Sequence, residues 1–250
     1  MEKFIKSPNL PEGKVSYVIV SNRIHSVVQE LKDNFHISVT VPEALPEISG
    51  EERFHADMGV CHLGEDSFIV ESSNKSVINM LKEKNAKHEL CECVTAKMPM
   101  LNVCITGDKI ICNKNKADKR ILSYAESKGL KILHTNQGYT KCSSAVVYEN
   151  ALITSDRGIY ELCRKNNIDI LLISEGNIGL SGYPYGFIGG CCGKLAPDVL
   201  AFSGRINNHP DHENIKAFAK NYGVDIISLG SENLYDIGGI IPVTEEMYNF

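Results

Sequence analysis

Cysteine, histidine and carboxylate side chains occur in four short segments that could contribute to one site. A cysteine thiolate is a nucleophile, histidine moves protons near neutral pH, and a carboxylate orients a histidine or binds a cation. The four segments are His55-Ala56-Asp57, Lys141-Cys142-Ser143-Ser144, Gly189-Gly190-Cys191-Cys192 and Asp236-Ile237-Gly238-Gly239. They lie far apart in the sequence, so joint chemistry requires a fold that brings them to one point.

His55 and Asp57 are the best-defined pair among these residues. They are two residues apart, so both side chains point to the same side of an extended chain. A single histidine is more often a surface or core residue, and most cysteines pack in the core. Asp236 either binds a cation or caps a turn. Both interpretations stay open for each group until the fold is considered.

A repeated unit of a strand, a tight turn, a second strand, a helix and a third strand organises the chain. Turns at Asp66, Asp108, Asn150 and Asp198 are 42, 42 and 48 residues apart, and an apolar run follows each of them. A fixed period of this size indicates repeated supersecondary units. In a closed ring of such units, the first strands converge on one axis.

The two ends of the chain contain complementary halves of one more unit. The segment from Val15 to Val20 has the pattern of a second strand, and the segment from Gly239 to Val243 has that of a first strand. Pairing them closes a five-fold ββαβ propeller of α/β (α+β) class and makes residues 1–250 a single domain. The alternative is a doubly wound sheet, which does not need one hairpin for every helix.

A helical pattern follows every second strand. The five patterns cover residues 24–34, 76–84, 119–128, 159–166 and 213–222. The residues just past them suit the left-handed conformation that ends helices: Asn34, Asn85, Gly129, Asn167 and Gly223. Three residues occupy N-cap positions: Asn74, Asp156 and Asp211.

Composition and charge exclude several classes of function. The net charge of −5 and the isoelectric point near 5.9 argue against nucleic-acid binding by general electrostatics. No apolar stretch approaches the roughly 20 residues of a membrane span, and the first residues lack a signal-peptide pattern. Nine scattered cysteines fit reduced thiols, so we expect a cytoplasmic protein. The sequence does not indicate an oligomeric state.

No cofactor and no metal site are expected. Cys91-Glu92-Cys93 places two thiols on one strand face, but no second Cys or His pair stands at zinc-finger spacing. The glycine-rich run from Gly186 to Gly190 lacks the Lys-Ser/Thr end of a phosphate-binding loop.

Five ββαβ units closed end to end resemble the pentein fold, the α/β-propeller of guanidino-group-modifying enzymes. These include arginine and agmatine deiminases, dimethylarginine dimethylaminohydrolases and amidinotransferases. In that family a cysteine attacks the guanidinium carbon, a histidine two blades away shuttles protons, and acidic residues hold the cation. His55-Ala56-Asp57 is similar to the family's His-x-Asp element, and Gly238-Gly239 resembles the Gly-Gly before its nucleophile.

The position of the nucleophile departs from the family pattern. Those enzymes carry it in the last blade, directly after the Gly-Gly, where this chain has Ile240-Ile241-Pro242 and no thiol. The blade that holds the family's histidine has Tyr139-Thr140-Lys141-Cys142 instead. The active constellation is therefore either rotated around the pore or lost.

A rotated site has two candidate nucleophiles. Cys142-Ser143-Ser144 is similar to the family's Cys-x-Ser/Thr element and adjoins Lys141, so Cys142 is preferred. Cys191, which follows Gly189-Gly190, is close behind. Both lie two units from His55 around a five-membered ring.

Two function hypotheses follow. The first is a cysteine-dependent hydrolase or transferase acting on a small guanidino or amidino compound in the central pore. Cys142 is then the nucleophile, His55 the general acid and base, and Asp57 and Asp236 hold the cation. Two further residues are candidate ligand contacts: Lys141, and Tyr185 in an aromatic loop that acts as a lid, a substrate wall or plain packing. The second hypothesis is a non-catalytic pentein-like protein that binds a ligand or partner at the pore.

Overall fold

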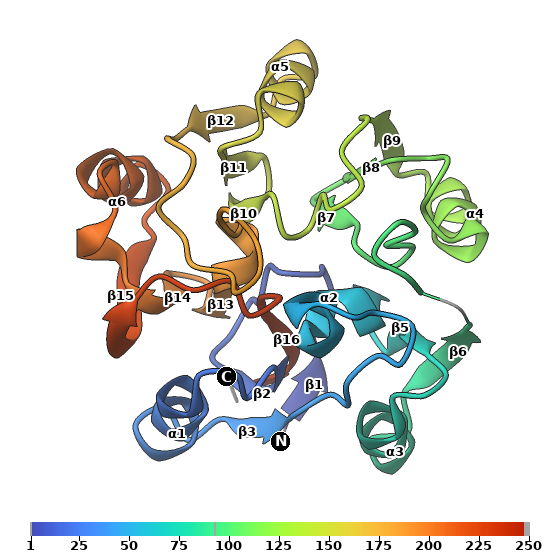
Figure 1. The fold of residues 1–250 in the computed structure, drawn as a ribbon. Coiled ribbons are helices and arrows are strands. Elements are labelled where there is room, and N and C mark those ends of the chain that lie inside the picture. Colours follow the sequence, from blue (N-terminus) through green and yellow to red (C-terminus); the bar gives the residue numbers. More distant parts are fainter. Residues whose placement is uncertain (1, 93, 248–250) are drawn as a thin grey trace.

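Five small β-sheets surround a central axis, with the longer helices at the outside of the ring (Figure 1). The computed structural model describes residues 2–92 and 94–247. Four sheets have three strands each: β4 (Val60–Gly64), β5 (Ser67–Glu71) and β6 (Lys87–Cys91); β7 (Cys104–Thr106), β8 (Lys109–Cys112) and β9 (Lys131–His134); β10 (Ala145–Tyr148), β11 (Ala151–Thr154) and β12 (Asp169–Leu172); β13 (Cys192–Ala196), β14 (Val199–Arg205) and β15 (Asp225–Asn233).

Each of these sheets repeats one connection. The first two strands form an antiparallel hairpin, and a helix then leads to a third strand that pairs parallel to the second. The long helices are α1 (His25–Asp33), α3 (Lys75–Glu83), α4 (Lys119–Ser127), α5 (Arg157–Lys165) and α6 (His212–Lys220). The predicted ββαβ unit is confirmed, and the doubly wound alternative is wrong because every unit begins with a hairpin.

The fifth sheet joins the two ends of the chain. Strand β16 (Ile240–Glu246) pairs antiparallel with β2 (Val15–Val20), and β2 pairs parallel with β3 (Ser38–Thr40). The predicted pairing of the two terminal strands in one sheet is therefore confirmed. The sequence pattern missed the short edge strand β1 (Glu2–Phe4), which pairs with the outer side of β16.

Helix ends follow the predicted pattern except in the first unit. Positive φ angles of 57°, 67°, 57° and 68° occur at Asn85, Gly129, Asn167 and Gly223. Asn34, however, keeps a φ of −91°, and the left-handed residue is His36. The prediction failed there because Asn34 keeps the right-handed conformation and extends the last turn of α1. The amides of Asn34 and Phe35 both donate to the carbonyl of Glu30 in this turn.

The predicted N-caps are confirmed in part. The Asp156 side chain accepts a hydrogen bond from the amide of Ile159. Asn74 and Asp211 occupy cap positions without a side-chain cap bond, and the carboxylate of Asp211 instead accepts from the amide of Ser174. Asp118, which the sequence pattern did not single out, caps α4.

Apolar side chains fill the space between neighbouring sheets and the inner faces of the helices. The buried clusters combine residues of adjacent units, such as Phe202 with Val147 and Ile19 with Val70. Each unit therefore buries its apolar faces against its neighbours. Within the described residues, every helix is too short or too polar to cross a membrane.

Candidate functional site

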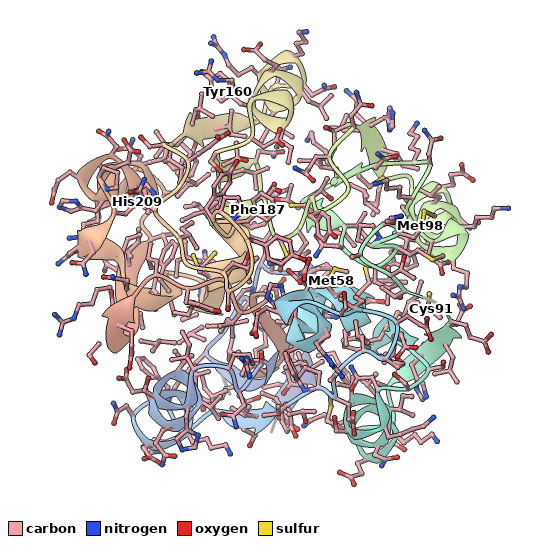
Figure 2. The ribbon with its side chains drawn as sticks, in the orientation of Figure 1. Met58, Cys91, Met98, Tyr160, Phe187 and His209 are labelled. Carbon is pink, nitrogen blue, oxygen red and sulfur yellow. The ribbon has the colours of Figure 1, made fainter. Side chains whose placement is uncertain are left out.

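The predicted site residues lie in short turns before the first strands and not in the strands themselves. His55 precedes the four-residue helix α2 (Ala56–Gly59), which leads into β4. Cys142 lies in a turn before β10, and Cys191 ends a 3₁₀ helix before β13. The expected strand alternation was wrong at these positions because a helical turn, not a pleated strand, sets the direction of each side chain. Figure 2 shows two residues of these segments, Met58 and Phe187, near the centre of the ring.

Cys142, Asp57 and His55 meet at one point. The thiol of Cys142 donates a hydrogen bond to Asp57, with 2.9 Å between Sγ and Oδ2. One donor atom from each of the three side chains lies within 4.8 Å of the other two. All three residues are buried, with exposed fractions of 1–3%. The structure therefore brings together the predicted nucleophile, its predicted acid–base partner and one predicted carboxylate.

Asn102 holds the turn that carries Cys142, and the sequence analysis gave it no role. Its Oδ1 atom accepts hydrogen bonds from the amides of Lys141 and Cys142, at 2.9 and 3.1 Å. Its Nδ2 atom donates to Sγ of Cys142 at 3.1 Å. Asn102 is the polar residue in the apolar segment Leu101-Asn102-Val103, at the position in its unit that precedes a first strand. A polar residue at that position was the signal in the sequence that could have identified Asn102 as a site residue.

Asp236 orients His55 from the last unit. Its Oδ1 atom lies 3.6 Å from Nδ1 of the His55 ring and accepts from the amide of Gly238 at 3.0 Å. Its Oδ2 atom accepts from the amide of Phe187 at 2.9 Å. Asp236 therefore caps a turn, as one of its two alternatives expected, and it also faces the histidine.

Glycines make this close approach possible. A Cβ atom at Gly190 would overlap the carboxylate of Asp236, and one at Gly238 would overlap His55. Gly238 also has a φ of +77°, which a side chain disfavours. The two Gly-Gly pairs of the sequence therefore leave room for the buried histidine and aspartate.

A cavity of about 290 Å³ opens onto the cluster. Its described lining is strongly aromatic and carries two carboxylates; it consists of Glu52, His55, Tyr139, Cys142, Leu180, Tyr183, Pro184, Tyr185, Phe187 and Asp236. The loop with Tyr183 and Tyr185 forms one wall of this cavity. A wall was one of the three roles considered for that loop, beside a lid and plain packing. The volume suits a small molecule.

Three predicted site residues lie outside this lining: Cys191, Lys141 and Asp57. Cys191 is buried in an apolar cluster, and its thiol donates to the carbonyl of Ile188 at 3.1 Å. Lys141 is buried behind Cys142, where its Nζ atom donates to the carbonyl of Gly189 at 3.4 Å. Lys141 and Asp57 line a separate narrow cavity on their other side. The structure therefore separates Cys191 and Lys141 from the cavity that Cys142 faces.

Charge and burial act strongly on the cluster. Burial, reinforced by Asp236 and opposed by His55 and Lys141, raises the pKa of Asp57 to about 6. Burial, with the carboxylates of Asp57 and Asp236, raises the pKa of the Cys142 thiol well above its usual value. The thiol is consequently protonated at neutral pH unless a positive charge enters the cavity.

The donor set of the cluster also matches the ligand types of zinc. Imidazole, thiolate and carboxylate are the groups that hold Zn²⁺ in proteins, and His55, Cys142 and Asp57 are close enough to share one ion. The thiol pair considered from the sequence is different: Cys93 lies outside the described residues, and Cys91 is the buried last residue of β6.

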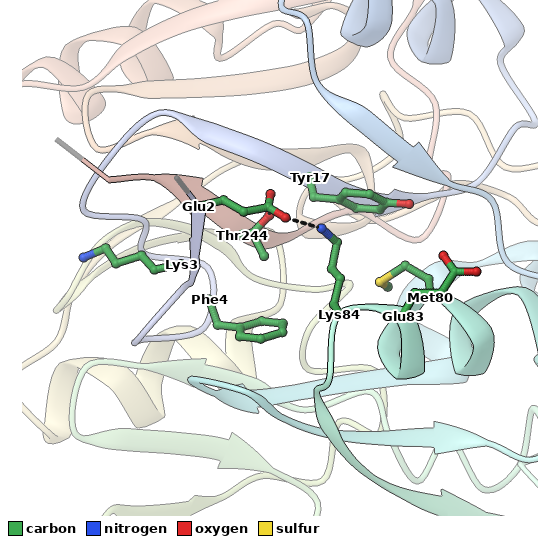
Figure 3. Close-up of a pocket in the computed structure, with 8 residues that line it drawn as sticks. All are labelled: Glu2, Lys3, Phe4, Tyr17, Met80, Glu83, Lys84 and Thr244. Atoms are coloured by element: carbon green, nitrogen blue, oxygen red, sulfur yellow. Dashed lines mark hydrogen bonds and ion pairs between the residues drawn. The ribbon is translucent and has the colours of Figure 1, made fainter. Parts of the chain in front are cut away.

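Another cavity of about 390 Å³ lies between the terminal strands and α3 (Figure 3). It is crossed by the hydrogen bond from Lys84 Nζ to Glu2 Oε1, at 2.6 Å. Its described lining has no cysteine and no histidine. The cluster beside Cys142 is therefore the stronger candidate for catalysis.

Comparisons with known proteins agree with the architecture. The model of the family described as "Family of unknown function (DUF6873)" matches residues 19–241. A search of proteins with curated functions finds no match. Among solved structures, DDAH (dimethylarginine dimethylaminohydrolase) from Pseudomonas aeruginosa is 12% identical over 87% of this chain and 93% of its own, with a TM-score of 0.53.

Two further structures are similar over most of their length. The inosamine-phosphate amidinotransferase of Streptomyces griseus is 11% identical over 96% of this chain and 97% of its own, with a TM-score of 0.55. The agmatine deiminase of C. jejuni is 11% identical over 92% and 90%, with a TM-score of 0.52. These enzymes are penteins, so the fold of this chain is that of the pentein superfamily, as the sequence resemblance implied.

Proposed function

The chain belongs to the DUF6873 family of unknown function, and we propose that it is a cysteine-dependent hydrolase or transferase acting on a small guanidino or amidino compound. One observation carries this proposal: Cys142, Asp57 and His55 meet in a buried cluster at the wall of an aromatic, acidic cavity. A planar cation suits such a cavity because carboxylates and aromatic faces both attract it.

The cationic ligand itself activates the thiol. Its positive charge offsets the carboxylates that raise the pKa of Cys142, so the thiol proton passes to Asp57 along their hydrogen bond. The sulfur then attacks the guanidinium carbon and forms a C–S bond. Protonated His55 gives its proton to the leaving nitrogen, the C–N bond breaks, and an amine departs from a cationic thiouronium intermediate.

The second half of the reaction restores the enzyme. Neutral His55 accepts a proton from water, or from an acceptor amine in a transferase, while the oxygen or nitrogen attacks the same carbon. The C–S bond then breaks, and the Cys142 sulfur recovers its proton from Asp57. In hydrolysis the second proton of the attacking water passes from the product to solvent, where the amine released in the first half takes it up. In transfer the new guanidinium keeps the positive charge, and no proton is left over. Asp236 positions the imidazole for both transfers, since it faces Nδ1.

Affinity labelling tests the proposal. We expect a 2-haloacetamidine, which is a cation, to alkylate Cys142 selectively and saturably, and much faster than the neutral haloacetamide does. Peptide mass spectrometry across pH locates the adduct, and His55→Ala should abolish the selectivity. Turnover of simple guanidines and amidines, assayed as release of ammonia or amine, completes the test. Slow, equal labelling of all thiols together with no turnover would refute the enzyme.

A non-catalytic ligand-binding protein is the second candidate. It is favoured by Ile240, which stands where the resemblance to the pentein enzymes implies a nucleophile, and by the raised pKa of Cys142. This candidate predicts saturable binding of amidines in calorimetry, with neither a Cys142 adduct nor turnover.

We further propose that residues 1–250 act as one domain and that the protein works in the cytoplasm with its thiols reduced. The pairing of β16 with β2 supports the first statement because it ties both chain ends into one sheet. The second is supported by the eight cysteines among the described residues, all of which are free and buried.

A further inference from the structure

Glu52 is a buried carboxylate in the same cavity, and the reaction described above does not use it. It lies in the 3₁₀ segment Glu51–Phe54, directly before His55, and is only 6% exposed. Its Oε2 atom is buried and makes no hydrogen bond within residues 2–92 and 94–247. Burying a carboxylate without a positively charged partner is costly, so this position favours a cationic group of a ligand.

Among the residues that the structure describes, no positively charged side chain pairs with Glu52. The described lining of the cavity contains no Lys or Arg, and the imidazole of His55 already faces Asp236. The adjacent Arg53 places its guanidinium 5.3 Å from the centre of the Phe54 ring and forms no ion pair with Glu52 in the described chain. The Glu52 carboxylate is therefore available to pair with a positively charged group of a ligand in the cavity.

Two tyrosines, Tyr183 and Tyr139, lie in the same cavity as the Glu52 carboxylate. The hydroxyl of Tyr183 lies on the same side of Gly50 as Oε2 of Glu52, where both would contact a Cβ atom at that position. Burial, followed by hydrogen bonding to Glu52 and its charge, raises the pKa of Tyr183 to about 12, so the Tyr183 hydroxyl is a neutral donor close to this carboxylate. Tyr139 lines the same cavity. An alkylammonium group gains from a carboxylate and aromatic faces together.

We propose that Glu52 is a specificity-determining residue that binds a second cationic group of the ligand. The inference rests on the proposed function, which places a guanidinium or amidinium at Cys142. The preferred ligand class then has a cation at both ends. A ligand whose far end is a carboxylate is disfavoured because it meets Glu52 and no basic residue of the described lining.

Three probes with the same guanidinium and different tails test this inference. They are 4-aminobutylguanidine, butylguanidine and 4-guanidinobutanoate, titrated calorimetrically into the whole protein. We expect the amine-tailed probe to bind about tenfold more tightly than butylguanidine, because it gains one charge-assisted hydrogen bond to Glu52. The carboxylate-tailed probe should bind most weakly, because Glu52 repels its negative charge.

The Glu52→Gln variant should lower the affinity for the amine-tailed probe about tenfold, while the affinity for butylguanidine changes less than about threefold. Glu51→Gln is the matched control, because Glu51 is the next residue but pairs with Arg23 and does not line the cavity. Thermal unfolding checks that each variant is folded. The tail preference of the unmodified protein does not depend on any variant.

The titrations distinguish a wrong role for Glu52 from a wrong function. Butylguanidine binding without a tail preference, or an equal effect of Glu52→Gln on all three probes, would overturn the role of Glu52 and leave the proposed function standing. Failure of all three probes to bind the unmodified protein would overturn both.

Discussion

The thiol of Cys142 and the carboxylate of Asp57, 85 residues apart in sequence, share a buried hydrogen bond of 2.9 Å. The sequence analysis assigned Asp57 to the cation and His55 to the thiol proton. The geometry gives Asp57 the direct contact with the thiol. A carboxylate in this position keeps the sulfur protonated until a cation arrives, because both would otherwise carry negative charge.

Asp57→Asn should change how stability depends on pH. The pKa of Asp57 rises from its usual 3.8 to about 6 on folding, so the folded protein holds this proton more tightly. The resulting stabilisation is complete below about pH 4 and is lost between about pH 4 and 6, which amounts to about 3 kcal/mol. Relative to the unmodified protein, the variant should therefore gain stability as pH rises through this range.

Urea unfolding of both proteins at several pH values between 4 and 7 measures this difference. Asp33→Asn, on the exposed face of α1, corrects for the general effect of removing one carboxylate. A difference between Asp57→Asn and the unmodified protein that stays constant over the range would contradict the buried, protonatable carboxylate.

Asn102→Ala should slow alkylation of Cys142 and destabilise its turn. The amide group of Asn102 lowers the pKa of the Cys142 thiol, although burial dominates, so its removal leaves less thiolate at a given pH. The amides of Lys141 and Cys142 also lose their acceptor, at about 1–3 kcal/mol of unfolding free energy. Iodoacetamide kinetics read by mass spectrometry give the first quantity, and denaturant unfolding gives the second.

Asn113→Ala is the matched control for Asn102. Asn113 is a buried asparagine whose Nδ2 atom donates to the carbonyl of Asn136, away from the cluster. It should lower stability without altering the alkylation of Cys142. Equal alkylation rates in the two variants would argue against a special role for Asn102.

Gly190→Ala should disrupt the site through steric overlap alone. The added methyl group meets the carboxylate of Asp236, so Asp236 must move and lose its contact with His55. We expect loss of about 1–3 kcal/mol of stability and loss of guanidine binding. Gly129→Ala is the control: nothing lies within 4 Å of its Cβ position, and only its φ of +67° is strained. It should cost about 1 kcal/mol and leave binding intact, and equal binding by both variants would count against the proposed geometry.

Deletion of residues 1–20 should prevent folding, because it removes β2 from between β16 and β3. Deletion of residues 1–4 removes only the edge strand β1 and should leave a folded protein of lower stability. Circular dichroism and the cooperativity of thermal unfolding distinguish the two. A cooperative transition in the longer deletion would mean that the ring does not need its closing strand.

The sequence by itself determined the architecture. Tight turns, apolar runs and helix-ending residues are local signals that recur in every unit, so the ββαβ repeat, the five long helices and the pairing of the chain ends were all predictable. One exception, at Asn34 and His36, came from an additional right-handed residue after α1, which local composition does not specify.

Only the tertiary structure decided how the site is composed. Its members come from turns whose side-chain directions depend on packing between units, and period-two alternation does not apply there. The sequence thus predicted that His55, Asp57 and Cys142 could meet, but not that Cys191 is enclosed in apolar packing or that Asn102 holds the thiol. Glu52 was equally unpredictable, because a carboxylate oxygen that finds no hydrogen-bond partner among residues 2–92 and 94–247 is identified only from the tertiary contacts around it.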